Sequence, residues 1–296
     1  MIGVALVATA LAWATIGLPH GPASLPGWSV SLAFVGAFGG VIAAYGDGRG
    51  LPAVGRALKA VGWSLLVGFS GLLAITVWTT LLWVAVSSLA PGEPGTTYRL
   101  ALGAVALGLG TGTVALIYFR WTGKSLSYLD FRVPTKRDVG YFAAGVLALF
   151  GLQIGVSVLF AQLGLSTASH SVEQAAQTGD PTILLLLIPA SWLIIGPGEE
   201  LLYRNIIQKS LYDIFGEWGA VIVASVVFAL AHILAYAGGA SSLVSLANTL
   251  AVIFLLSLIL GATYLKTDNL TVSAAIHGTF DAVVFAAMYV QITGGP

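Results

Sequence analysis

The chain has 296 residues, of which 57% are hydrophobic and 8% are charged, with a mean hydropathy of +0.94 and a formal net charge of zero. Soluble domains contain about 25% charged residues, so this chain has too few to cover a water-exposed surface and is expected to be an integral membrane protein. The zero net charge gives no reason to expect nucleic-acid binding, and the lack of cysteine excludes disulfides and thiolate chemistry.

Apolar segments of the length that a bilayer requires, about 17–25 residues, recur along the whole chain. The sequence predicts an all-α, polytopic transmembrane helical bundle of about 8–9 spans, near 1–18, 28–45, 61–89, 100–119, 139–164, 181–203, 218–236, 242–265 and 270–291. Residues 1–18 lack the positive n-region and the cleavage pattern of a signal peptide, so we expect a helix there as well.

The longest polar stretch, residues 120–138, is the best candidate for an internal boundary. All the intramembrane acids and histidines that we consider for chemistry follow it. We therefore divide the chain into an N-terminal transmembrane region of unassigned role, 1–138, and a core that carries the candidate chemistry, 139–296.

Basic residues predict the orientation, because cytoplasmic loops are enriched in Lys and Arg. We expect the N-terminus in the cytoplasm and the C-terminus outside. With this orientation all of the 12 Lys and Arg residues except Arg99 fall in cytoplasmic loops, and Arg204 is one of those in a loop. We expect these loops to lie against anionic lipid headgroups. His20 and His170 fall in outer loops, where we expect them to be solvated.

The sixth span ends in two glutamates and an arginine, Glu199, Glu200 and Arg204. An ionisable residue inside the membrane costs about 2.5–3.5 kcal/mol on insertion scales, so it marks a candidate functional site. In a helix Glu200 and Arg204 share a face and are expected to form an ion pair, while Glu199 points about 100° away and is left free. Pro197 predicts a kink just before the acids. By itself the motif fits solvated charges at a helix end equally well.

His232 lies deep in the seventh span, with Phe228 one turn before it on the same face. If the turn between the two spans lies near Phe215 and Gly216, Glu199 and His232 are almost equally far from it and therefore lie at the same depth. A lone membrane histidine often only packs against its neighbours. One that matches a free carboxylate in depth favours a functional pair.

The last span adds His277 and Asp281, which again share one helix face. Such a pair can chelate a metal, or the carboxylate can accept the imidazole N–H and fix its tautomer. A purely structural hydrogen bond is the alternative. The depth argument is weaker here, because His277 is close in sequence to the cytoplasmic turn expected at Asp268.

The motifs E-E-x-x-x-R, F-x-x-x-H and H-x-x-x-N/D are complete and in order: Glu199-Glu200 with Arg204, Phe228 with His232, and His277 with Asp281. In this the chain resembles the CPBP family of intramembrane proteases, which includes type II CAAX prenyl endopeptidases and bacteriocin-processing or self-immunity proteins. The resemblance covers about residues 139–291. It implies an endopeptidase that acts on membrane-associated proteins or peptides, prenylated CAAX proteins among them. Asp281 stands where the eukaryotic-type CAAX proteases have Asn, which bears on the substrate more than on the fold.

Peptide hydrolysis requires an activated water, stabilisation of an oxyanion and a proton for the leaving amine. We expect Glu199 to activate the water with help from His232, and His277 with Asp281 to orient the substrate carbonyl and stabilise the intermediate. The ion pair Glu200–Arg204 would hold the helix in place, with Phe228 as further structural support.

Other interpretations of the same residues remain open. A Glu, His, His and Asp set can bind Zn²⁺, but the chain has no H-E-x-x-H motif, so we favour a reaction without a metal. Buried acids and histidines also build proton-coupled transporters, although those tend to show internal repeats, and none is visible here. A non-catalytic immunity or scaffold protein on the same fold is the third possibility. The oligomeric state is not indicated by the sequence.

Overall fold

The computed structural model describes residues 51–89 and 95–294. The predicted spans at 1–18 and 28–45, and His20, lie outside the described residues. Within the described part every regular element is helical. The elements are α3 (Leu51–Leu89), α4 (Thr96–Thr122), α5 (Lys136–Leu163), α6 (Ser171–Thr178), α7 (Ile183–Ala190), α8 (Gly196–Glu200), α9 (Tyr212–Ala231), α10 (Ile233–Ala237), α11 (Leu243–Thr267) and α12 (Leu270–Thr293), with π-helical turns at Ser191–Ile195 and Leu201–Gln208 and a 3₁₀ turn at Leu126–Tyr128.

Seven helical segments of the described chain are long and apolar enough to cross a membrane. They are Pro52–Leu89, Thr97–Thr122, Lys136–Leu163, Ile183–Gln208, Tyr212–Ala231, Leu243–Thr267 and Leu270–Thr293. Each overlaps one predicted span, which confirms the all-α, polytopic bundle. The orientation of the termini stays a prediction.

Local sequence signals explain where the long helices begin and end. Before α5, the Thr135 side chain accepts the Asp138 N–H at 3.3 Å, and Asp138 accepts the Thr135 N–H at 2.8 Å, which forms a capping box. The chain leaves α11 through Asp268 in the left-handed region (φ 46°), at the turn that we expected. Gly216 (φ 70°) breaks the first turn of α9, so the predicted turn between the sixth and seventh spans is also present.

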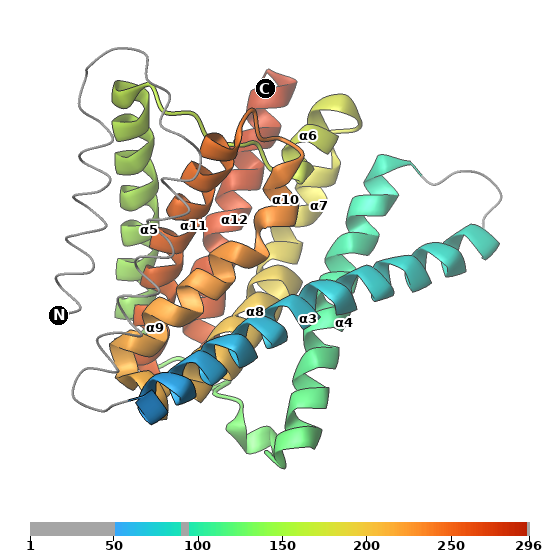
Figure 1. Ribbon diagram of the computed structural model, residues 1–296. Helices are drawn as coiled ribbons and strands as arrows, with labels where there is room; N and C mark the ends of the chain where they lie inside the picture. The colour runs from blue at the N-terminus through green and yellow to red at the C-terminus, as the bar shows by residue number, and fades with distance from the viewer. Residues whose placement is uncertain (1–50, 90–94, 295–296) are drawn as a thin grey trace.

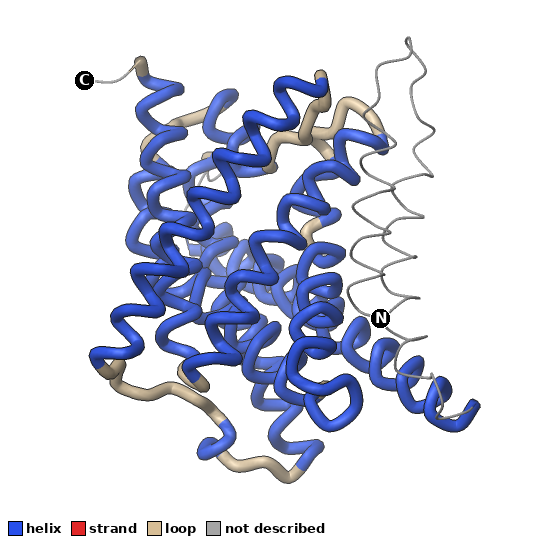
Figure 2. The backbone as a smooth tube through the Cα atoms, turned by 90° about the vertical axis from the view of Figure 1, so that its left-hand side faces the viewer, coloured by secondary structure: helices blue, strands red, loops and turns tan. Residues whose placement is uncertain are grey.

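The helices form a bundle with α9 at its centre. In Figure 1 α5, α11 and α12 lie side by side, α9 runs obliquely across α11, and α3 packs on α4 and crosses α9; Figure 2 shows the same bundle from the side. In the most apolar 18-residue stretch of α9, 67% of the residues are buried. In the same kind of stretch of α5, 11% are buried. Within the described residues α5 therefore has most of its surface uncovered, whereas α9 is packed on several sides.

The polar stretch 120–138 is held against the base of the bundle. The Asp130 carboxylate accepts hydrogen bonds from Lys209 Nζ at 2.7 Å and Asn205 Nδ2 at 3.1 Å, and the Asp130 carbonyl accepts the Leu270 N–H at 2.9 Å. These contacts fix the connection beneath the start of α12. The domain boundary at residue 138 stays a prediction.

The sixth span is longer than expected and does not end before Arg204. Its helix continues to Gln208, and the Arg204 side chain is 0% exposed. Placing Arg204 in a cytoplasmic loop was therefore wrong, because its guanidinium has a buried carboxylate partner within the helix.

Candidate functional site

The span that carries both glutamates is irregular on either side of them. Pro197 has no N–H to donate, and the Gly196 N–H bonds the Ser191 carbonyl five residues back, which is the spacing of a π turn. A second π segment, Leu201–Gln208, follows the acids directly. The irregularity expected near Pro197 is thus present as π turns on both sides of the acids. The kink itself stays a prediction.

Glycines let α12 approach this distorted segment until the two backbones touch. A Cβ at Gly278 would lie 2.6 Å from the Ser191 carbonyl oxygen, and one at Gly196 would lie 2.7 Å from the Ala274 carbonyl oxygen. No side chain fits at either position without a shift of backbone. This close contact brings the end of α8 next to His277 on α12.

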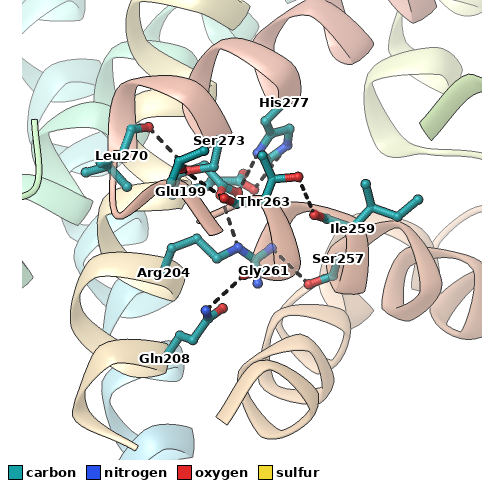
Figure 3. Close-up of polar contacts among 12 residues, drawn as sticks. Glu199, Arg204, Gln208, Ser257, Ile259, Gly261, Thr263, Leu270, Ser273 and His277 are labelled. Carbon is teal, nitrogen blue, oxygen red and sulfur yellow. Dashed lines mark hydrogen bonds and ion pairs between the residues drawn. The ribbon is translucent and has the colours of Figure 1, made fainter. Parts of the chain in front are cut away.

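Glu200 belongs to a fully buried polar cluster, which we call the buried network (Glu200, Arg204 and Ser257). Glu200 Oε2 accepts a hydrogen bond from Arg204 Nε at 3.0 Å. Figure 3 shows the second contact, in which Arg204 Nη2 donates to Ser257 Oγ on α11 at 2.9 Å. Both Glu200 and Arg204 are 0% exposed. The ion pair expected from their spacing is therefore present.

Glu200 has a second contact that its sequence position did not indicate. Its other oxygen, Oε1, lies 3.1 Å from His277 Nδ1, although the two residues are 77 positions apart. Because an ionised carboxylate only accepts, the hydrogen lies on Nδ1. Glu200 therefore links Arg204 to His277 and orients the imidazole from behind.

Glu199 points away from the buried network, as its position on the helix predicted. Its Oε2 lies 3.9 Å from His232 Nε2 and 3.9 Å from His277 Nε2. These distances are too long for direct hydrogen bonds, and within the described residues this oxygen has no hydrogen-bond partner. A buried carboxylate oxygen thus lies between two imidazoles without a direct bond to either.

The second imidazole is also fixed in its tautomer. His232 Nδ1 lies 2.8 Å from the Phe228 carbonyl oxygen, and since a carbonyl only accepts, the hydrogen is on Nδ1. The Nε2 lone pair then faces Glu199. The Phe228 ring packs against both imidazoles, with centroids 4.5 Å from His232 and 5.8 Å from His277.

Asp281 completes the set that we call the carboxylate–imidazole group (Glu199, His232, His277 and Asp281). Its Oδ2 lies 3.4 Å from His277 Nε2. All four side chains line one cavity of about 300 Å³. The structure therefore brings together four of the motif residues around one cavity, and it places Glu200 outside that cavity.

The predicted match in depth between Glu199 and His232 is confirmed by their contact. His277 reaches the same level even though it is closer in sequence to its turn, at Asp268, than His232 is to the break at Gly216. Figure 1 shows the reason: α9 is oblique, so each of its residues advances less along the bundle than a residue of α12.

The rest of the cavity wall is mostly apolar and comes in part from a helix outside the predicted core. α4 contributes Leu100, Gly103, Ala104 and Leu107, and α12 contributes Phe280, Val284, Phe285 and Met288. Gly198 allows α4 to lie against α8, since a Cβ there would be 2.8 Å from Thr111 Oγ1. The α4 residues that line the cavity carry no charge. Sequence reasoning, which started from charged residues and histidines, therefore did not identify them.

His170 was expected to be solvated, and this was wrong. It is partly buried and lines the cavity beside Tyr236. Burial, with a smaller effect of His232, lowers the pKa of His170 to about 4. The ring is therefore neutral at pH 7, and a loop histidine with no charged neighbour in sequence gives no signal of such a position.

The donor atoms of the carboxylate–imidazole group do not all have the spacing of a zinc site. Zinc–ligand distances of about 2.0–2.1 Å place neighbouring atoms of a tetrahedral site about 3.4 Å apart. Asp281 Oδ2 and His277 Nε2 have this spacing, at 3.4 Å, but Glu199 Oε2 is 3.9 Å from each imidazole nitrogen. Among the described residues no group of three or more His, Cys, Asp or Glu side chains is arranged to hold a metal ion. As they stand, these residues do not fit a zinc centre.

Comparison with known proteins agrees with the motifs. No curated protein and no solved structure matches the chain. Residues 181–283, which contain every residue of the three motifs, match the family model described as type II CAAX prenyl endopeptidase Rce1-like. The resemblance predicted from the motifs is thereby confirmed over residues 181–283, where this membrane protein is similar to a family of proteases.

Proposed function

We propose that the protein is an intramembrane endopeptidase that hydrolyses peptide bonds of membrane-associated proteins or peptides, with Glu199 as the residue that activates water. Prenylated proteins with a CAAX C-terminus are the first substrate class to test, because the matched family is described by that activity. The bilayer is the second partner, since the site lies on helices long enough to cross it.

The observation that carries this proposal is the position of Glu199 Oε2. It has no hydrogen-bond partner among the described residues, and it lies 3.9 Å from an imidazole nitrogen on either side. Where polar atoms lie more than about 3.5 Å apart, as here, an interaction between them requires a bridging water. A water held by Glu199 and His232 Nε2 would lie beside His277 inside the cavity, where a substrate carbonyl can enter.

Proton transfer then follows from the donors and acceptors of the site. Glu199 takes a proton from the water, whose oxygen attacks the carbonyl carbon to form a tetrahedral oxyanion. His277 Nε2, held by Glu200 at the opposite ring nitrogen and by Asp281 at 3.4 Å, donates to that oxyanion when the ring is protonated. The C–N bond breaks as the amine receives the proton that Glu199 removed, giving one carboxylic acid and one amine.

The buried network supports this chemistry without contact to the substrate. Glu200 is fully buried and outside the cavity, and its two oxygens hold Arg204 and His277. No step is assigned to a metal ion, because the donor spacing does not fit one.

The test is cleavage by purified protein in detergent micelles of a fluorogenic peptide with a farnesylated CAAX C-terminus, beside the same peptide without the farnesyl group and a library of membrane peptides. The wild type is compared with Glu199→Gln and His232→Ala. Glu217→Gln is the matched control, since it changes an exposed glutamate at the start of α9. A general base contributes about 10²–10⁴-fold, so we expect Glu199→Gln to lose at least that factor in kcat while Glu217→Gln keeps wild-type activity.

The outcomes separate the alternatives. Full activity of Glu199→Gln would contradict the assignment of the water-activating residue. A well-folded wild type that cleaves no peptide would favour a non-catalytic scaffold or immunity protein, or a proton-coupled transporter. Zinc in stoichiometric amount, lost together with activity on chelation, would contradict the reaction without a metal.

A further inference from the structure

Tyr236 is a cavity residue that belongs to none of the three motifs. It lies on α10, four residues after His232, and lines the same cavity as the carboxylate–imidazole group. The polar residues that line this cavity within the described chain are His170, Glu199, His232, Tyr236, His277 and Asp281. Tyr236 thus contributes the one hydroxyl group among them.

The Tyr236 ring is held by a rigid corner of the structure. The His170 ring packs edge-to-face against it, with centroids 4.8 Å apart and planes at 84°. His170 is itself fixed, because its Nδ1 accepts the Val172 N–H at 3.0 Å at the start of α6. The Ser169 N–H bonds the Gly239 carbonyl at 3.4 Å, and a Cβ at Gly239 would come within 2.3 Å of the Ser169 carbonyl oxygen.

The Tyr236 hydroxyl is available to a ligand. It makes no hydrogen bond to any residue in the described part of the chain. Burial, with the nearby charges of Asp281, Glu199 and Glu173, raises the pKa of Tyr236. The phenol therefore keeps its hydrogen at neutral pH, and Tyr236 lines the same cavity as Glu199 and Asp281.

A peptide in this cavity needs such a donor. A buried carbonyl oxygen without a hydrogen bond is costly, and α4 and α12 present mainly apolar side chains to the cavity. The carboxylates of Glu199 and Asp281 accept when ionised and cannot satisfy a carbonyl. Tyr236 is a neutral donor in the same cavity as the reacting group, and its ring packs against His170.

We propose that the Tyr236 hydroxyl donates a hydrogen bond to a main-chain carbonyl of the bound peptide, and that His170 is a positioning residue that holds the Tyr236 ring. This inference rests on the proposed peptidase function and adds a substrate-binding residue to it. Its place in the reaction is to align the peptide before Glu199 and the water attack.

The isosteric variant Tyr236→Phe removes the hydroxyl and keeps the ring. The substrate is the fluorogenic CAAX peptide, in whichever form, farnesylated or not, the wild type cleaves. We expect kcat/KM to fall about tenfold, mainly because KM rises. Tyr289→Phe on α12 is the control, because it removes a tyrosine hydroxyl that does not line the cavity. It should keep the wild-type constants. Equal KM and kcat for Tyr236→Phe and wild type would overturn the proposal.

A double-mutant cycle tests the role of His170. His170→Asn keeps a side chain able to cap α6 and removes the ring that packs on Tyr236. We expect it to raise KM on its own and to add little in the Tyr236→Phe background, because it acts through the hydroxyl. Multiplicative effects of the two substitutions would overturn the positioning role. A wild type that cleaves neither peptide would remove the proposed function and this inference together, whereas an active wild type with unaffected variants would remove the inference alone.

Discussion

Glu199 and Glu200 are adjacent in the chain, yet they belong to two regions of opposite character. In the buried network both Glu200 oxygens have partners, and the Glu200 and Arg204 side chains are 0% exposed. In the carboxylate–imidazole group, Glu199 Oε2 has no partner among the described residues, and the Glu199 residue lines a cavity. The difference indicates that one carboxylate stabilises the fold, while its neighbour is kept available for chemistry.

The largest effect is expected from removing the cation of the buried network. Arg204→Met leaves the Glu200 carboxylate buried without its cation, and breaking such a pair costs about 3–5 kcal/mol. We expect a large drop in the midpoint of unfolding in detergent, measured by thermal or denaturant titration. The double variant Arg204→Met with Glu200→Gln should recover much of this loss, since no unpaired charge remains. A single variant as stable as the wild type would show that the network does not support the fold.

The second prediction concerns the part of the cavity wall that His170 forms. Its pKa is about 4 in the folded protein against 6.5 ordinarily, so between these values the unfolded chain binds a proton that the folded protein does not. The stabilisation is therefore complete above pH 6.5 and is lost as the pH falls to 4, by about 3 kcal/mol at most.

His170→Asn is expected to remove this contribution. The free energy of unfolding, measured from pH 7 to pH 4, should fall less steeply for the variant than for the wild type. Parallel curves for the two proteins would contradict the burial of the imidazole. The comparison is needed because carboxylates also titrate in this range.

The third prediction tests the close helix contact that joins the two regions. Gly278→Ala would place a methyl group 2.6 Å from the Ser191 carbonyl oxygen, and overpacking of this kind costs about 1–3 kcal/mol. Because α12 must shift, His277 would move relative to Glu199, and we expect activity to fall as well as stability. Gly112→Ala on α4 is the matched control, since nothing lies within 4 Å of the added carbon. Equal effects of the two substitutions would show that the contact does not position the site.

Much of this arrangement could be predicted from sequence, because it depends on local spacing. Helix periodicity was enough to pair Glu200 with Arg204 and to leave Glu199 free. The Phe215–Gly216 turn gave the matching depth of Glu199 and His232, and both features are present in the structure.

The remaining features depend on contacts between distant segments. The Glu200–His277 hydrogen bond requires the backbone contact at Gly196 and Gly278, which no spacing within a single helix encodes. The oblique path of α9 and the π turns beside Glu199 follow from tertiary packing and a missing proline donor. The burial of His170 likewise depends on how its loop packs near Gly239.

The smallest effect on stability is expected at Glu199 itself. Glu199→Gln keeps the shape of the side chain, and Oε2 has no hydrogen-bond partner among the described residues to lose. The free energy of unfolding should therefore change by less than about 0.5 kcal/mol. Glu200→Gln, in contrast, removes the charge that Arg204 and His277 share, and it should destabilise the protein clearly. Both variants are expected to lose activity, so the unfolding midpoint distinguishes the two roles. If Glu199→Gln were destabilised as strongly as Glu200→Gln, the two glutamates would share one structural role, and the separation between a buried network and a reactive carboxylate would be wrong.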